Sequence, residues 1–156
     1  MAETLGSLVD KLSIKNLRIW HIDKEINSDA LQKWQVKQLH IKKELALKQR
    51  DALVQEINSF LMLALEGKVE VRDQKLKLYQ NLNVENVDGL NGLGAAISEL
   101  ALRNIRLWNL EDEVRSKDIS DSQIADCKRK IDTNNQERND LIDKVDQILE
   151  SKANKK

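Results

Sequence analysis

The chain has 156 residues and a mass of 18.0 kDa, which fits one domain with one hydrophobic core. Its 26 Lys and Arg balance its 26 Asp and Glu, so no net charge attracts nucleic acid or an anionic membrane. Pro is absent, Gly occurs 5 times and charged residues make up 33%, a composition that excludes an all-β fold and is typical of long solvated helices. We therefore expect a single all-α domain over residues 1–156.

Three further features of the sequence indicate the cellular compartment of the protein. Its longest apolar run, Phe60–Leu65, is far shorter than the roughly 20 residues that a membrane-spanning helix needs. The first residues, MAETLGS, lack the apolar stretch of a signal peptide, and Cys127 has no second cysteine to pair with. These features predict a cytoplasmic protein without membrane insertion.

The first half of the chain predicts a helical hairpin. Apolar residues recur every three or four positions over residues 4–27, and the polar break from Asn27 to Asp29 ends this helix. A second helix follows over residues 30–66 and stops at Gly67, where a glycine can adopt a left-handed conformation. Its expected apolar face consists of Leu31, Leu39, Leu45, Leu53, Ile57, Phe60 and Ala64.

A long connection is expected over residues 67–92. It contains helix-breaking Asn-Val and Asp-Gly pairs, and Val69 and Val71 alternate with polar residues as in an extended segment. A connection of this length usually has a structural role. We expect it to cross the overhanging end of the second helix, held down by Tyr79, rather than to act as a functional lid.

The second half repeats the first at a constant offset of 88 residues. Residues 5–63 align without gaps with residues 93–151, and 13 of the 59 pairs are identical, among them Gly6 with Gly94, Asn16 with Asn104 and Trp20 with Trp108. The repeat predicts helices over residues 93–116 and 120–151, followed by a frayed tail over residues 152–156. We interpret it as a duplication.

The predicted fold is an all-α, pseudo-two-fold antiparallel four-helix bundle made of the two duplicated hairpins. Neither hairpin has enough apolar surface to be stable alone, so the two should bury their seams against each other. An alternative keeps the end of the second helix exposed, in which case a second copy could cover it in a homodimer.

Polar residues interrupt the apolar seams and form the candidate binding site. In the second hairpin the cluster comprises Asn104, Trp108, Asp132, Asn135 and Arg138, and in the first hairpin Asn16, Trp20 and Arg50. One interpretation is a closed hydrogen-bond network that sets helix register, in which case Arg138→Ala should be costly. The other is a pocket for an anion or a polar small molecule, with Arg138 as the charge and Trp108 as an apolar wall.

Other chemistries have little support. The two histidines, His21 and His40, lie in no metal-ligand spacing, and no nucleophile triad, phosphate-binding loop or dinucleotide fingerprint occurs. We therefore predict no metal, no cofactor and no catalytic residue. We expect His21 to make an interfacial hydrogen bond, and Cys127 to be a small core residue.

The C-terminal third resembles a family of bacterial helical proteins of uncharacterised function. Its signature is similar to an Asn followed four residues later by a Trp, an acidic pair, and a helix of the type I-D-x-x-N-x-x-R-N-D-L-I-x-x-x-D. Here these positions are Asn104, Trp108, Glu111, Asp112, Ile131, Asp132, Asn135, Arg138, Asn139, Asp140 and Leu141. The resemblance implies a link to glycosyltransferases of surface-polysaccharide clusters, because such genes are often neighbours. The first hairpin departs from the signature, with Glu44 where the second has Asp132.

The same stretch also looks somewhat like the first helix of all-α chorismate mutases. Arg129, Asp132 and Arg138 are the nearest matches to the residues that surround a dicarboxylate in those enzymes. The remaining helices do not clearly supply the further arginines that such a pocket needs. We therefore predict a non-catalytic accessory protein that binds another protein, a glycosyltransferase or related glycan enzyme, with an anion-binding protein or enzyme as the alternative.

Overall fold

The computed structural model describes residues 3–73 and 81–154, and these residues form four helices and no strand. They are α1 (Leu5–Ile26), α2 (Lys33–Leu65), α3 (Leu93–Val114) and α4 (Asp121–Ala153). The prediction of an all-α chain is confirmed. The bounds of α3 and α4 are those of α1 and α2 shifted by 88 residues at both ends, so the two hairpins have helices of equal length, 22 and 33 residues.

Local sequence signals account for the helix ends. The side chain of Thr4 accepts a hydrogen bond from the backbone N–H of Ser7, and Ser120 caps α4 in the same way. Gly67 ends α2 with a φ of 69°, as its sequence position predicted. The predicted tail is shorter than expected, because Lys152 and Ala153 belong to α4, while residues 155 and 156 lie outside the described residues.

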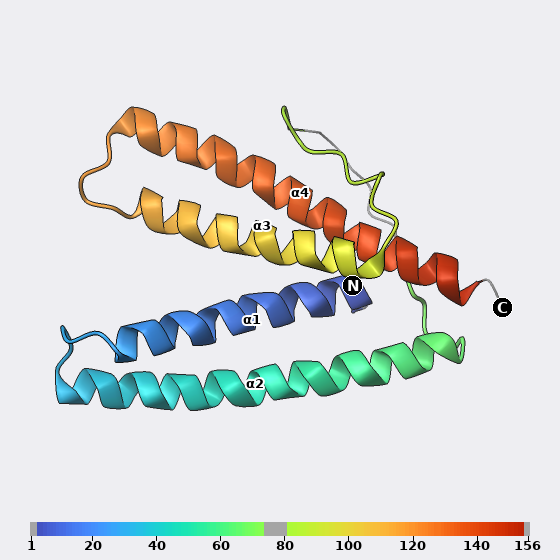
Figure 1. The fold of residues 1–156 in the computed structure, drawn as a ribbon, viewed down its shortest axis with the longest axis horizontal. Helices are drawn as coiled ribbons and strands as arrows, with labels where there is room; N and C mark the ends of the chain where they lie inside the picture. Colours follow the sequence, from blue (N-terminus) through green and yellow to red (C-terminus); the bar gives the residue numbers. More distant parts are fainter. Residues whose placement is uncertain (1–2, 74–80, 155–156) are drawn as a thin grey trace.

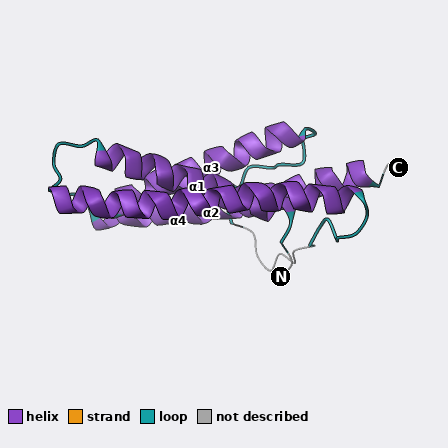
Figure 2. Cartoon of the chain, turned by 90° about the horizontal axis from the view of Figure 1, so that it is seen from below, coloured by secondary structure: helices purple, strands orange, loops and turns teal. Residues whose placement is uncertain are grey.

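The chain forms two antiparallel hairpins, α1 with α2 and α3 with α4 (Figure 1). α1 and α3 run in the same direction, and α1 also contacts both helices of the second hairpin. Figure 2 shows that the helices share one long direction. The hairpins meet where α1 and α3 begin and separate toward the two hairpin loops, so the space between them opens along the molecule.

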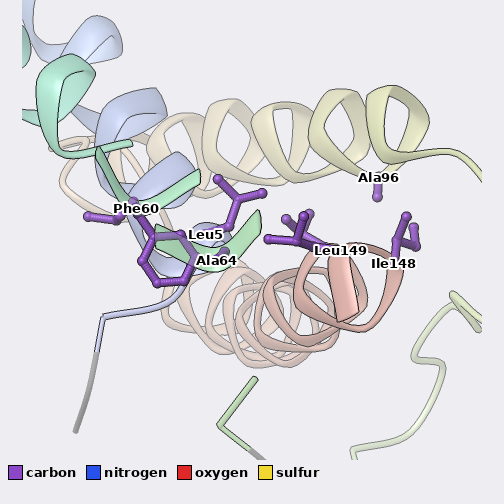
Figure 3. Close-up of a cluster of buried hydrophobic side chains, with 8 residues drawn as sticks. Leu5, Phe60, Ala64, Ala96, Ile148 and Leu149 are labelled. Carbon is purple, nitrogen blue, oxygen red and sulfur yellow. The ribbon is translucent and has the colours of Figure 1, made fainter. Parts of the chain in front are cut away.

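The main hydrophobic core lies at the end where the hairpins meet (Figure 3). All four helices contribute to it, with Leu5, Leu8, Phe60, Ala64, Ala96, Val145, Ile148 and Leu149. A second, smaller cluster joins Leu100 of α3 to Leu141 and Ile142 of α4. Burial of these apolar side chains is what holds the two hairpins together.

The structure corrects the expected packing of α2. Its buried residues are Leu39, Ala46, Phe60 and Ala64, and only its last turns reach the core shared by the four helices. Leu45, which we expected on the packed face, is 57% exposed. Because the hairpins separate along their length, α1 is the helix against which α2 chiefly packs.

The described parts of the connecting segment, residues 67–73 and 81–92, make their hydrogen bonds to other elements mainly with α4, whereas we expected the segment to cross the end of α2. Val69 and Val71 pack on the main core, and Arg72 makes a two-pronged ion pair with Asp143 at 2.8 and 3.0 Å. Farther along, the backbone N–H of Asn81 donates to the side chain of Gln136 at 2.6 Å. Tyr79, expected to anchor this segment, lies outside the described residues.

Candidate functional site

A groove of about 400 Å³ lies between α1, α3 and α4. It contains four residues of the predicted cluster: Asn104, Trp108, Asn135 and Arg138. The remaining lining residues are Ile14, Leu17, Arg18, Leu107, Glu111, Asp112 and Arg115. The second hairpin thus brings together most of its predicted site, and α1 forms the opposite wall.

Two residues that line the groove, Asn104 and Arg138, approach an aspartate that the sequence pattern did not indicate, Asp10 of α1. Asp10 of α1 is 8% exposed, and its Oδ1 accepts a hydrogen bond from Nδ2 of the buried Asn104 at 2.9 Å. Nε of Arg138 lies 3.9 Å from the same oxygen, beyond hydrogen-bond distance, and has no partner although the atom is buried. The Asn104 amide therefore has a hydrogen-bond acceptor. Nε of Arg138 lies beside the same carboxylate without making a hydrogen bond.

The rim of the groove carries charges of both signs. Arg18 and Arg115 accompany Arg138, while Glu111 and Asp112 each lie 3.7 Å from Arg115. These ion pairs are long and exposed, so they hold the side chains weakly. The lining thus carries three guanidinium groups and two carboxylates.

An aromatic contact supports the apolar wall. His21 of α1 stacks on Trp108 of α3, with ring centroids 4.3 Å apart and planes 11° apart. Trp20 meets the same imidazole edge-on at 4.8 Å. His21, for which we expected an interfacial hydrogen bond, thus joins the hairpins by ring stacking.

The cluster predicted in the first hairpin does not form. Asn16 is exposed, Trp20 is 57% exposed, and Arg50 pairs with its neighbour Asp51 at 2.7 Å. The physical reason is that α1 packs on two sides. One side faces α2, and the other, which carries Asp10, faces the second hairpin, so the position of Asn16 is left in solvent.

Asp132 does not belong to the groove either. It is exposed, and its backbone carbonyl accepts a hydrogen bond from the side chain of Asn81 at 3.2 Å, beneath the connecting segment. Arg129 is also exposed, so of the three residues that resemble the chorismate mutase set only Arg138 lines the groove. The geometry therefore gives no support to that enzyme interpretation.

The most buried guanidinium of the ion pairs is Arg103, not Arg138. Its side chain is 3% exposed; Nε donates to Glu137 at 2.6 Å, and the other nitrogens reach Glu85 at 2.5 Å and Glu99 at 3.1 Å. Glu137 also accepts the backbone N–H of Glu85 at 3.0 Å and so ties the connecting segment to α4. The sequence offered one signal: Arg103 directly precedes the seam residue Asn104.

The described residues contain no candidate metal site, and their one cysteine is buried. Among residues 3–73 and 81–154, no group of three His, Cys, Asp or Glu side chains could hold a metal ion. Cys127 is 2% exposed, as expected for a core residue. Burial, and next the carboxylate of Glu113, raises the pKa of its thiol, so the thiol is poorly reactive.

Comparison with protein families identifies the family to which the chain belongs. The model of DUF4254, described as a protein of unknown function, matches residues 1–72 and 95–156. The chain belongs to the DUF4254 family. The first matched part of this DUF4254 protein contains its first hairpin and the second contains nearly all of its second hairpin, and the unmatched residues 73–94 are most of the connecting segment and the first two residues of α3.

This assignment confirms that the chain belongs to an uncharacterised family, and it adds no activity. No curated protein and no solved structure matches this DUF4254 chain. None of the helices in the described part is long and apolar enough to cross a membrane.

Proposed function

We propose that this DUF4254 protein is a non-catalytic helical protein that binds another protein chain through the outer face of α2. The observation that carries the proposal is a line of apolar side chains on α2 that no other helix covers. Trp34, Ile41, Leu45 and Leu63 are 63%, 55%, 57% and 39% exposed. Apolar side chains that are exposed along one side of a helix often mark an interaction site.

These residues form one line along the helix. Together with Ala52 they are spaced 7, 4, 7 and 11 residues apart, close to whole numbers of helical turns. We call Trp34, Ile41, Leu45, Ala52 and Leu63 the α2 stripe. This spacing is typical of helices that pack against a second helix.

The repeat provides an internal comparison. At the same positions α4 carries only polar residues, namely Ser122, Arg129, Thr133, Asp140 and Ser151. Helix length and position in the hairpin are the same, so neither requires apolar residues at these positions. The α2 stripe is therefore a property of α2 alone, which favours a binding role for it.

The test replaces stripe residues by those of α4. A tagged double variant, Ile41→Arg with Leu45→Thr, should lose a protein that co-purifies with the wild type in stoichiometric amount. Leu102→Thr serves as the control, because Leu102 is 41% exposed on α3 and lies outside the stripe. Equal capture by the wild type and the double variant would refute the proposal. We further propose that a glycosyltransferase, the partner that the family resemblance implies, binds the outer faces of the bundle away from the stripe.

We also infer that the two hairpins arose by duplication into a pseudo-two-fold pair. The shift of 88 residues in the helix bounds supports this inference. A second support is a repeated contact: Lys15 donates to Gln49 at 2.6 Å in the first hairpin, and at the equivalent positions Arg103 donates to Glu137 at 2.6 Å. The seams differ, because only the second hairpin buries its asparagine.

A second candidate function is binding of a small anion in the groove. The observation in its favour is the buried Nε of Arg138, a donor without an acceptor at an open groove. Calorimetry with inorganic phosphate and with citrate should show binding that Arg138→Met abolishes. Arg50→Met is the matched control, because Arg50 is the repeat counterpart and lies outside the groove. Absence of heat with both anions would count against this function.

A further inference from the structure

We infer that the α2 stripe is covered by a second copy of the chain, with the two α2 helices antiparallel across a two-fold axis. This inference rests on the proposed function and names the partner of the same surface. Four features of α2 support it: the distribution of charge along the helix, the pairing of stripe positions, the charges beside the stripe, and the open surroundings of the helix.

The charges of α2 are divided between its two halves. Residues 33–50 hold six basic side chains and one acidic side chain, a net charge of +5. Residues 51–66, which include the C-cap Glu66, hold three acidic and no basic side chains, a net charge of −3. Two antiparallel copies would place the basic half of each against the acidic half of the other, whereas parallel copies would juxtapose like charges.

This division does not serve the isolated helix. The amino end of a helix carries a partial positive charge and the carboxyl end a partial negative charge. In α2, Lys33 lies at the amino end and Glu66 at the carboxyl end, so each charge stands at the unfavourable terminus. An antiparallel partner accounts for this arrangement, because it brings the opposite charge to each end.

Four of the five stripe residues pair with one another in one antiparallel register, and the fifth, Ile41, lies level with the partner's Glu56. In that register Trp34 lies opposite the partner's Leu63, and Leu45 lies opposite the partner's Ala52. In both pairs the two residue numbers add up to 97, so both pairs belong to the same register. Each pair sets a large side chain against a smaller one, as packing of a helix pair requires. By two-fold symmetry each pair occurs twice, so the interface is isologous.

The same register pairs charges beside the stripe. The partner's Glu56 lies level with residue 41, one residue from Lys42. The partner's Asp51 lies level with residue 46, two residues from Lys48. A residue in a helix rises 1.5 Å, so these offsets are about 1.5 and 3 Å, within reach of a lysine side chain. These flanking pairs favour the antiparallel register over other registers.

The surroundings of α2 leave room for a second copy. α2 lies at the outer edge of the molecule in Figure 1 and in front of the other helices in Figure 2, which views it from below. The corresponding side of α4 is crossed by the connecting segment, which contacts Gln136, Asp143 and Lys144 on either side of Asp140. Among the described residues, no such segment crosses the α2 stripe.

The first experiment measures the mass of the full chain by sedimentation equilibrium over a wide concentration range. We expect a dimer of about 36 kDa, twice 18.0 kDa. Leu45→Thr should weaken the dimer roughly tenfold or more, as truncation of a central interface residue does, while Leu102→Thr should leave it unchanged. A monomer at every concentration, or a dimer unaffected by Leu45→Thr, would overturn the inference.

The second experiment tests the direction of the helices by disulfide cross-linking. Lys48 lies half a residue from the proposed axis, so Lys48→Cys should cross-link the two copies. Leu45→Cys should not, because the two copies of residue 45 would be about 10 Å apart along the helices. The native Cys127 does not interfere, since it is buried. A parallel pair would reverse this result, with efficient cross-linking through Leu45→Cys.

A charge exchange tests the flanking pairs. Glu56→Lys places two lysines together and should weaken the dimer, and the further substitution Lys42→Glu should restore it. Failure of the second change to restore the dimer would contradict the register. The outcomes also separate the inference from the function on which it rests: a monomeric protein that binds a different chain through the stripe disproves the homodimer and leaves the proposed function intact. A protein that is monomeric and loses no partner on substitution of the stripe disproves both.

Discussion

The backbone N–H of Gly6 in α1 donates to Oδ1 of Asp146 in α4 at 2.7 Å, and both residues are buried. This bond provides an acceptor for one of the first N–H groups of α1, which has none within the helix. It also brings the two backbones very close, because a Cβ added at Gly6 would lie 2.2 Å from the carbonyl oxygen of Ile142. At Gly6 the backbones of α1 and α4 therefore lie too close together for any side chain at this position.

Gly6→Ala should destabilise the protein by about 1–3 kcal/mol, because the methyl group cannot fit without moving α1 away from α4. Gly94, its repeat counterpart, has nothing within 4 Å of an added Cβ. Gly94→Ala should therefore be neutral or stabilising by up to about 1 kcal/mol, since alanine is the better helix former. Chemical denaturation of both variants measures the difference, and equal midpoints would contradict this account.

Arg103→Ala should be the most costly loss of a charged side chain. It would leave Glu137 buried without its cation, and breaking such a pair typically costs about 3–5 kcal/mol. Lys15→Ala removes the repeat counterpart, whose bond to Gln49 is exposed, and should cost well under 1 kcal/mol. The free energy of unfolding of each variant, from urea titration, checks the contrast. Similar losses for both would show that Arg103 is not the key charge of the second hairpin.

Arg138→Ala should cost only about 1 kcal/mol, contrary to the closed network considered from sequence. The Arg138 side chain is 28% exposed and lies 3.9 Å from its nearest carboxylate, so its loss leaves no tightly paired buried charge behind. Asp10 keeps its hydrogen bond from Asn104. The same urea titration measures this variant, and a loss as large as that of Arg103→Ala would restore the closed-network interpretation.

The thiol of Cys127 should make stability fall at alkaline pH. Burial raises its pKa above that of the unfolded chain, so the unfolded state releases its proton first as the pH rises. The stability that the protonated thiol contributes is present in full below the pKa of the unfolded thiol. It is lost as the pH rises from that pKa to the pKa of the folded thiol. Cys127→Leu, which introduces the repeat counterpart Leu39, removes it. Unfolding at pH 8 and pH 10 should therefore show a smaller alkaline loss for this variant than for the wild type.

Much of the fold could be predicted from local sequence. Apolar periodicity, Gly67 and the polar breaks located all four helices, because helix formation and capping depend on residues three or four apart. The predicted bounds of the second helix in each hairpin, 30–66 and 120–151, differed in length, whereas the structure gives both helices 33 residues. Asn104, Trp108, Asn135 and Arg138 were expected together, since the hairpin alone sets them level with one another.

The tertiary structure decided which equivalent residues are used. Asn16 and Asn104 share one sequence context, yet only Asn104 is buried, because the side of α1 that meets the second hairpin carries Asp10 and not Asn16. No periodicity distinguishes them. Leu45, which the sequence pattern assigned to the core, lies on the outer face of α2 and is exposed. Helix positions follow from short-range propensity and are readable from sequence, whereas helix faces are chosen by contacts between residues far apart in the chain, such as the close approach of Gly6 to Ile142.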